Sequence, residues 1–158
     1  MQGSVRKLRG AIAVATSTTT TSTCAWDVFI NHCGVDTKRN IVGLLHDNLV
    51  AKHGIPTFLD RSSMKAGDKM IPKIEEAIDG CKVGVVVLSP RYCHSYFCLH
   101  ELALLVEAKK RIVPIFFDVK SSQLRVMENI AKYYSPQHLQ RFTSALNEAR
   151  YTVESPRD

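Results

Sequence analysis

Apolar residues follow two patterns that alternate along this chain from residue 26 onward. Short and nearly continuous apolar runs indicate buried strands at residues 26–30, 55–60, 82–90 and 111–119. Longer stretches, in which apolar residues recur every three or four positions, indicate helices at residues 36–54, 73–80, 95–110 and 136–151. The pattern weakens after Asp118, before the last of these helices.

The alternation of strands with helices predicts an α/β fold with a parallel sheet and helices on both of its faces. For a chain of this size we expect a flavodoxin-like strand order, 2-1-3-4, with a possible fifth strand. Pro114 within the fourth strand points to an edge or an irregularity. We expect one domain over residues 25–153, flanked by tails at residues 1–24 and 154–158.

Composition and charge narrow the possible partners. The chain has 158 residues and a formal charge of +6. Three of its 21 basic residues lie in the first 24 positions, which hold no acid, so the remainder has an excess of only three positive charges. That excess is too small to indicate nucleic-acid binding, but it suits an anionic small molecule. No apolar run approaches the roughly 20 residues of a membrane span.

The first 24 residues (MQGSVRKLRGAIAVATSTTTTSTC) are basic and then rich in serine and threonine. This composition favours a disordered tail on a cytoplasmic protein, with an organelle transit peptide as the alternative. The five cysteines form no CxxC pair, and their odd number favours reduced thiols. The histidines have no metal-ligand spacing, so we expect no metal site.

One carboxylate stands out for its position. In an open parallel sheet, ligands bind beyond the carboxyl ends of the strands. The segments that follow the first three predicted strands there are NHCGVDT, RSSMKAGD and SPRYCHSYF. Glu101 lies near the start of the helix that leaves the third of these loops, and Leu99 and Leu102 beside it belong to the apolar face. The fold therefore predicts Glu101 at the rim of a ligand crevice.

The blocks WDVFINHCGVDTKRN, GIPTFLDRSSMKAGDKMIPKIEEAIDGCKVGVVVLSPRYCHSYFCLHEL, IVPIFFDV and ALNEA occur in order between residues 26 and 151. Together they resemble a plant-type Toll/interleukin-1 receptor (TIR) domain, here in the form of a TIR-only protein. The resemblance implies an NAD+ glycohydrolase or cyclase of innate immune and cell-death signalling, activated by self-association. Such an enzyme cleaves the nicotinamide N-glycosidic bond and releases ADP-ribose or a cyclised ADP-ribose. NAD+ is then a substrate, not a cofactor.

The resemblance assigns roles to particular residues. The stretch FCLHEL matches the catalytic pattern W-C-L-x-E-L, with Glu101 as the catalytic glutamate and Phe97 in place of the tryptophan. Where the family has Ser-Phe-Arg-Gly-Glu-Asp after its first strand, this chain has Asn31, His32, Cys33, Gly34, Val35 and Asp36. These six residues are implied to bind the substrate, together with Lys65, Gly67, Ser95 and Phe97.

Elementary chemistry suits these roles. A carboxylate stabilises the positive charge that develops on the ribose as a glycosidic bond breaks. The helix that begins near Asp36 and Thr37 offers free N–H groups to a pyrophosphate, Gly34 permits close approach of the backbone, and Lys65 or Lys38 adds charge. Asp36 is expected first as a helix cap. Phe97 offers an aromatic face for stacking, and the loop of Gly67 is a candidate lid.

Several alternatives remain at this point. A TIR module that only binds other TIR domains is the competing function, favoured by the altered NHCGVD loop and by Phe97. A Cys33–His32 nucleophile is disfavoured because neighbouring strand residues point apart. A phospho-receiver is rejected because the third strand ends in VVVLSP without an acceptor aspartate. The use of NADP+ or nucleic acid and the product formed stay open. The assembly geometry stays open too, since Gly43 and Leu44 replace the family's Ser-His pair.

Overall fold

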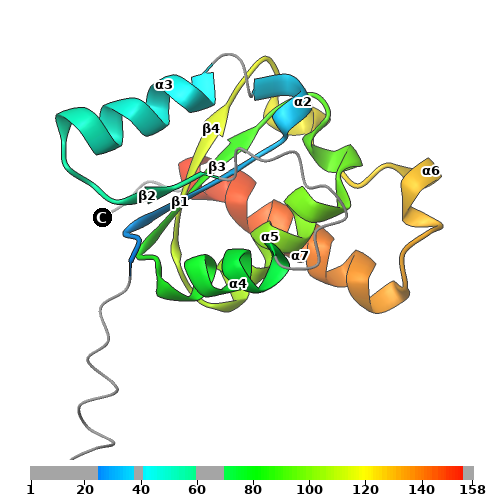
Figure 1. Ribbon diagram of the computed structural model, residues 1–158. Coiled ribbons are helices and arrows are strands. Elements are labelled where there is room, and N and C mark those ends of the chain that lie inside the picture. Colours follow the sequence, from blue (N-terminus) through cyan, green and yellow to red (C-terminus); the bar gives the residue numbers. More distant parts are fainter. Residues whose placement is uncertain (1–24, 38–40, 60–69, 155–158) are drawn as a thin grey trace, which may run out of the picture.

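Four parallel strands form the centre of the molecule, which was analysed as a computed structural model that describes residues 25–37, 41–59 and 70–154. The strands are β1 (Val28–His32), β2 (Thr57–Phe58), β3 (Val83–Leu88) and β4 (Arg111–Phe116). Their order is β2-β1-β3-β4, which confirms the predicted 2-1-3-4 arrangement (Figure 1). Within the described residues the sheet has no fifth strand.

The helical elements are α2 (Gly34–Thr37), α3 (Ile41–Asp47) with a π-helical continuation (Asn48–Lys52), α4 (Met70–Gly80), a short 3-10 turn (Tyr92–His94), α5 (Tyr96–Glu107), a second 3-10 turn (Ser121–Gln123), α6 (Glu128–Ala131) and α7 (Pro136–Glu154). The single helix predicted at residues 36–54 corresponds to two described elements, α2 and α3 with its π-helical continuation, and the residues between them lie outside the described part of the chain. The continuation ends at Lys52, shortly before Gly54, where the sequence predicted the end. Gly54 adopts a φ of 63°, which favours glycine because it has no Cβ.

Two boundaries differ from the sequence prediction for physical reasons. The first strand covers residues 28–32, not 26–30, because Asn31 and His32 pair with β3 despite their polar side chains. Helix α4 begins at Met70, three residues before the predicted start at 73. Pro72 suggested a later start, but proline is tolerated in a first helical turn, where its missing N–H has no helical partner in any case.

Alternate strand residues face two separate helical layers. Phe29, Val86 and Leu88 pack with α4, α5 and α7 in the larger apolar cluster. Ile30 and Val87 point to the other face, where α3 covers them. Figure 1 shows α3 above the strands and α4 and α5 below them. The continuous apolar runs of the sequence are therefore explained by a sheet that is buried on both faces.

The edge and the centre of the sheet carry two unusual residues. Pro114 lies in β4, which pairs only with β3, so the edge that its presence predicted is confirmed. An edge strand leaves one side of its backbone unpaired and therefore tolerates a residue without an N–H. Gly84 in β3 faces α5, and a Cβ at this position would lie 2.9 Å from both methyl groups of Leu105. The absence of a side chain thus lets α5 approach the sheet closely.

Helix α7 packs against both α5 and β4. Arg141 of α7 donates two hydrogen bonds to the carboxylate of Glu107, at 2.8 and 2.7 Å. The guanidinium lowers the pKa of Glu107, and the carboxylate raises that of Arg141.

Among the described residues, no helix is both long enough and apolar enough to cross a bilayer.

Candidate functional site

The site begins with the way in which α5 starts. Ser95 is the N-cap of α5, and its Oγ accepts a hydrogen bond of 3.3 Å from the backbone N–H of Cys98. Serine is favoured here because its oxygen satisfies an N–H that has no partner within the helix. Ser95 therefore acts as a helix cap. It sets the start of α5 and with it the positions of Phe97 and Glu101.

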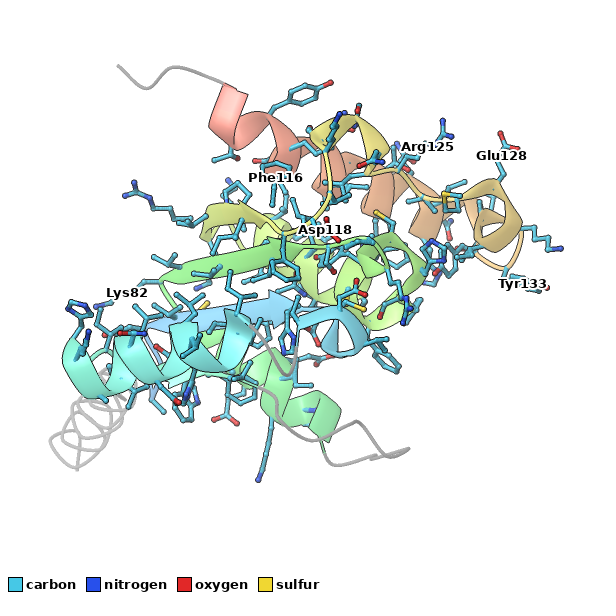
Figure 2. The ribbon with its side chains drawn as sticks, turned by 90° about the horizontal axis from the view of Figure 1, so that it is seen from above. Lys82, Phe116, Asp118, Arg125, Glu128 and Tyr133 are labelled. Carbon is cyan, nitrogen blue, oxygen red and sulfur yellow. The ribbon has the colours of Figure 1, made fainter. Side chains whose placement is uncertain are left out.

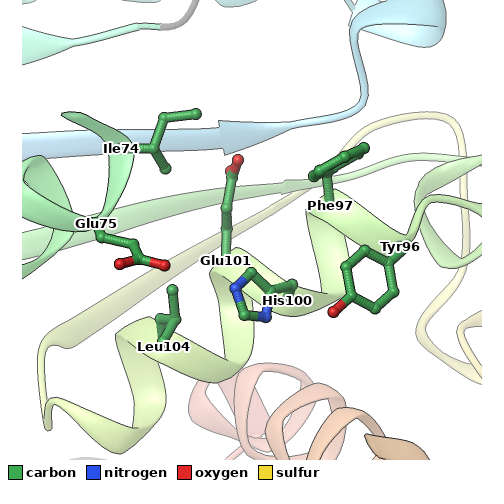
Figure 3. A pocket seen from close by; sticks show the side chains of 7 residues that line it. All are labelled: Ile74, Glu75, Tyr96, Phe97, His100, Glu101 and Leu104. Atoms are coloured by element: carbon green, nitrogen blue, oxygen red, sulfur yellow. The ribbon is translucent and has the colours of Figure 1, made fainter. Parts of the chain in front are cut away.

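A cavity of about 130 Å³ lies along the exposed face of α5, opposite the start of α4. Its walls are formed by Ile74, Glu75, Tyr96, Phe97, His100, Glu101 and Leu104. Figure 3 shows the Glu101 side chain pointing between Ile74 and Phe97. Most of the wall is apolar or aromatic, and carboxylates from two helices interrupt it. Such a cavity suits a flat, electron-poor or cationic ring.

Glu101 is half-buried and fixed in place. Its Oε1 accepts a hydrogen bond of 3.1 Å from the side-chain amide of Asn31, at the end of β1. A helix glutamate that only served solubility would extend into water, where such a bond has little value. The structure therefore places the predicted carboxylate in a cavity wall, at the edge of the sheet where the fold predicted a ligand crevice.

Asn31 is fully buried, with no exposed surface. Its Nδ2 also donates to the carbonyl oxygen of Cys98 at 3.2 Å, and its Oδ1 accepts a hydrogen bond from the hydroxyl of Tyr92. The Tyr92 hydroxyl lies 3.1 Å from that same carbonyl oxygen. Burial is the largest of the causes that raise the pKa of Tyr92 well above its usual value, so the phenol stays protonated.

Aromatic side chains line the outer part of the cavity. Tyr96 and Phe97 are 37% and 46% exposed and meet edge to face, with ring centroids 5.7 Å apart. His100 stacks on Tyr96 at 5.6 Å. Burial, together with the nearby charge of Arg141, lowers the pKa of His100, which favours the neutral ring at physiological pH. The Phe97 ring is available for stacking, as predicted for a ligand platform.

Two other residues predicted to bind the substrate, His32 and Asp36, make hydrogen bonds within the protein. His32 Nδ1 lies 2.9 Å from the hydroxyl of Thr37. Asp36 Oδ2 accepts hydrogen bonds from the Ser89 hydroxyl at 2.6 Å and the Arg91 backbone N–H at 2.7 Å. The expectation that Asp36 caps its own helix is therefore corrected, because α2 begins two residues earlier and Asp36 instead joins two loops at the sheet edge.

Cys33 and Cys98 are neighbours at the junction of this loop with α5. A hydrogen bond from the Cys98 thiol is the largest cause that lowers the pKa of Cys33, which is about 7. The same contact, together with burial, raises the pKa of Cys98 well above its usual value. The Cys98 thiol also lies 3.4 Å from the carbonyl oxygen of His32. All four described cysteines are free.

The sequence-predicted residues thus separate into groups. Glu101 and Phe97 line the cavity. Asn31 is not part of the lining and donates a hydrogen bond to Glu101. Gly34 and Val35 are exposed and stand apart from the cavity lining. Lys65, Gly67 and Lys38 lie outside the described residues.

Sequence reasoning missed part of the cavity wall. Tyr96, His100 and Leu104 recur with Glu101 at helical spacing, so the periodicity of α5 contained a usable signal. Glu75 had none, because only folding brings α4 against α5. Within residues 25–37, 41–59 and 70–154, no group of three or more histidine, cysteine, aspartate or glutamate side chains could hold a metal ion.

A four-stranded parallel sheet in the order 2-1-3-4, with helices on both faces, defines a flavodoxin-like α/β domain, and in this chain a cavity between α4 and α5 holds an acid. More specifically, the chain belongs to the TIR domain family, whose model matches residues 28–151.

Two curated plant proteins and one solved structure show the similarity. The chain is 49% identical to the "Probable 2' cyclic ADP-D-ribose synthase BdTIR" of Brachypodium distachyon, over 81% of this chain and 58% of that protein. It is 33% identical to the "TMV resistance protein N" of Nicotiana glutinosa, over 84% of this chain and 13% of that protein. The match to the TIR domains of the activated Roq1 resistosome has a TM-score of 0.65 and 29% identity, and covers 79% and 83% of the two chains. The chain thus spans a little more than half of the length of the Brachypodium protein and a much smaller part of the Nicotiana protein.

Proposed function

We propose that this chain cleaves NAD+ at the nicotinamide N-glycosidic bond, with Glu101 as the catalytic residue. The observation that carries the proposal is the Glu101 carboxylate, which is held by a buried amide and lines an aromatic cavity at the carboxyl edge of the sheet. Membership of the TIR family and the name of the Brachypodium relative, a cyclic ADP-ribose synthase, support the same reaction.

Cleavage of the nicotinamide N-glycosidic bond requires mainly electrostatic stabilisation from the protein. Nicotinamide leaves as a neutral base when the C1′–N bond breaks and its electron pair goes to the ring nitrogen. The ribose then carries positive charge, which a carboxylate close to the sugar stabilises. Water that attacks C1′ gives ADP-ribose and a proton, whereas attack by a ribose hydroxyl of the same molecule gives a cyclic product. The printed name of the Brachypodium relative favours a product closed through a 2′ oxygen.

The size of the cavity bears on how the site is completed. Its volume of about 130 Å³ holds one aromatic ring, whereas pockets for whole ligands of this class typically measure roughly 300–1,000 Å³. Most of a dinucleotide would therefore lie beyond the walls that the described residues form. We infer that a second copy of the chain supplies further walls, so that self-association activates the enzyme. The relationship to TIR domains seen in an activated resistosome supports this inference.

The first prediction tests the reaction itself. The purified chain, incubated at high concentration with NAD+, should release nicotinamide, and chromatography of the digest identifies the linear or cyclic product. Glu101→Gln removes the charge at nearly constant volume and should lower the rate ~10²–10³-fold. Glu128→Gln, the same change at an exposed position on α6 (Figure 2), is the matched control and should leave the rate unchanged.

Two outcomes of this assay decide between alternatives. Equal rates for the Glu101→Gln variant and the unsubstituted chain would refute the role of this carboxylate. No release of nicotinamide by a chain that still self-associates would instead favour the competing function, a TIR module that only binds other TIR domains. The same digestion with NADP+ measures whether a 2′-phosphate is accepted.

A further inference from the structure

The carboxylate of Glu101 is joined to a buried amide from a distant part of the chain. Asn31 lies 70 positions earlier, at the carboxyl end of β1, and its Nδ2 is 3.1 Å from Glu101 Oε1. This contact fastens a side chain of α5 to the central part of the sheet. Without it, the terminal torsion of a glutamate has only a broad preference, so its carboxylate samples many orientations.

The hydrogen-bonding capacity of the Asn31 amide is almost fully used within the protein. The two N–H groups of Nδ2 serve Glu101 and the carbonyl oxygen of Cys98, and Oδ1 accepts from the Tyr92 hydroxyl. The reverse orientation of the amide is excluded chemically. It would place Oδ1 against the Cys98 carbonyl and the Glu101 carboxylate, both of which act as acceptors in this network.

Burial separates this residue from any bound molecule. Asn31 has no exposed surface and does not belong to the lining of the cavity, whereas Glu101 does. A substrate in the cavity therefore meets Glu101 and not Asn31. The resemblance of the loop after β1 to a substrate-binding segment suggested direct contact for Asn31, but the observed contacts favour an indirect role.

We propose that Asn31 is a positioning residue, whose amide, itself fixed by Tyr92 and the Cys98 carbonyl, holds the Glu101 carboxylate in its working orientation. The functional consequence rests on the proposed NAD+ cleavage, but the physical link between the two side chains does not. Asparagine suits this position because it donates to two acceptors at once. Aspartate has nearly the same shape but would set a second carboxylate against Glu101.

Nuclear magnetic resonance tests the link independently of catalysis. In the full chain, the side-chain amide protons of Asn31 should exchange slowly with solvent and give resonances of their own. Glu101→Gln should shift these resonances, while Glu75→Gln, on the facing wall of the cavity, should leave them in place. Rapid exchange, or resonances that do not respond to Glu101→Gln, would overturn the proposal whether or not the chain cleaves NAD+.

Kinetics test the consequence for the reaction. Asn31→Ala and Asn31→Asp should each lower kcat about 10-fold or more while KM stays within about twofold, because the carboxylate is misdirected but the cavity walls are unchanged. Thr57→Val is the matched control, since Thr57 is also buried, and its hydroxyl donates a hydrogen bond to the backbone carbonyl oxygen of Ile55, which precedes β2. It should lower the melting temperature and leave kcat unchanged.

Two kinetic results would contradict the proposal. In the first, the Asn31→Ala and Thr57→Val proteins have similar melting temperatures, and kcat falls no further in Asn31→Ala than in Thr57→Val. The other is a rise in KM that accounts for the whole effect, which would indicate direct contact with the substrate. The chain and all of its variants could fail to cleave NAD+ while the resonance shift is still observed. In that case the proposed function is wrong, and the link between the two side chains stands.

Discussion

Cys33 and Cys98 illustrate at the scale of single residues how neighbours set the chemistry of a side chain. Both are buried thiols with almost equal exposure, 6% and 5%. Their pKa values nevertheless move in opposite directions, because the side-chain interaction between the two thiols stabilises the thiolate of Cys33 and disfavours that of Cys98. Since the thiolate is the reactive form, these two cysteines should differ strongly in reactivity at neutral pH.

This difference gives a prediction for pH dependence. The thiolate of Cys33 forms as the pH rises through about 7, so its modification by a small reagent such as methyl methanethiosulfonate should reach half its maximal rate near that pH. Cys93, whose pKa burial raises to about 11, is the internal control and should stay unmodified at pH 7. Mass spectrometry of the peptides measures both.

A second variant tests the cause. Cys98→Ala removes this partner thiol, so the half-maximum for Cys33 should move upward toward the ordinary thiol value of 9.0. A half-maximum near 9 in the unsubstituted chain, or equal rates for Cys33 and Cys93 at pH 7, would contradict the assigned hydrogen bond.

Glu101 also shows that residue type alone decides little. Its helix has a second glutamate, Glu107, whose carboxylate is half exposed and is bound by Arg141 of α7. The two acids lie six positions apart on α5, and therefore on different sides of the helix. One meets a cavity and a buried amide, and the other forms an ion pair near the surface.

At the scale of elements, the spacing between β3 and α5 is set by the residue that has no side chain. A Cβ at Gly84 would lie 2.9 Å from both methyl groups of Leu105, so these methyl groups can occupy their positions only because Gly84 has no side chain. Because Leu105 is fully buried, its side chain has little space into which to move. The close approach of α5 also sets the depth at which Glu101 meets the end of β1.

Gly84→Ala should therefore lower the free energy of unfolding. Overpacking in a filled core typically costs about 1–3 kcal/mol, which exceeds the gain of ~0.4–1 kcal/mol from restricting the unfolded chain. We expect a net loss of about 1 kcal/mol and a lower urea midpoint at an unchanged slope. Gly43→Ala is the matched control and should raise stability by up to about 1 kcal/mol, because Gly43 lies in α3 and nothing surrounds its missing Cβ within 4 Å.

Equal or inverted effects of these two substitutions would contradict the close packing of α5 on β3. Loss of stability in Gly84→Ala should also be partly relieved by Leu105→Val, which removes one methylene group from the crowded region. Relief of this kind identifies the Leu105 contact, and not strand propensity, as the cause.

At the scale of the whole molecule, the described residues of one copy offer only a small part of the surface that a dinucleotide needs. The cavity beside Glu101 measures about 130 Å³, and Phe97 and Tyr96 at its rim are partly exposed. Leu44, on the opposite side of the sheet in α3, is 67% exposed and stands where the family uses a Ser-His pair for self-association. This face is accordingly a candidate for contact between copies.

The rate of NAD+ cleavage should therefore rise faster than linearly with protein concentration. If two copies complete a site, the initial rate should increase about fourfold for each doubling while monomers predominate. Leu44→Arg places a charge on the α3 face and should lower the rate at a given concentration, without a change in melting temperature. Light scattering on the same samples measures the assembly. A strictly linear rate at every concentration would contradict activation by self-association.

The sequence alone determined the layered architecture, because hydrophobic periodicity reports which faces are buried. Continuous runs such as the one through Val85, Val86 and Val87 indicated strands covered on both sides, and the alternation of elements indicated the 2-1-3-4 order that was confirmed. The position of Glu101 at the carboxyl edge followed from its place in the helix after the third strand. These are local properties, which depend on spacing within a few residues.

Only the tertiary structure decided which groups meet across the chain. Nothing local to Asn31 indicates that it donates to a carboxylate 70 positions away, that Asp36 joins the loop after β3, or that Cys98 sets the pKa of Cys33. The same holds for Glu75, which α4 brings to the cavity. Such contacts depend on strand register and on how closely helices pack against the sheet. These distances are fixed by the summed packing of many side chains, and no short stretch of sequence contains them.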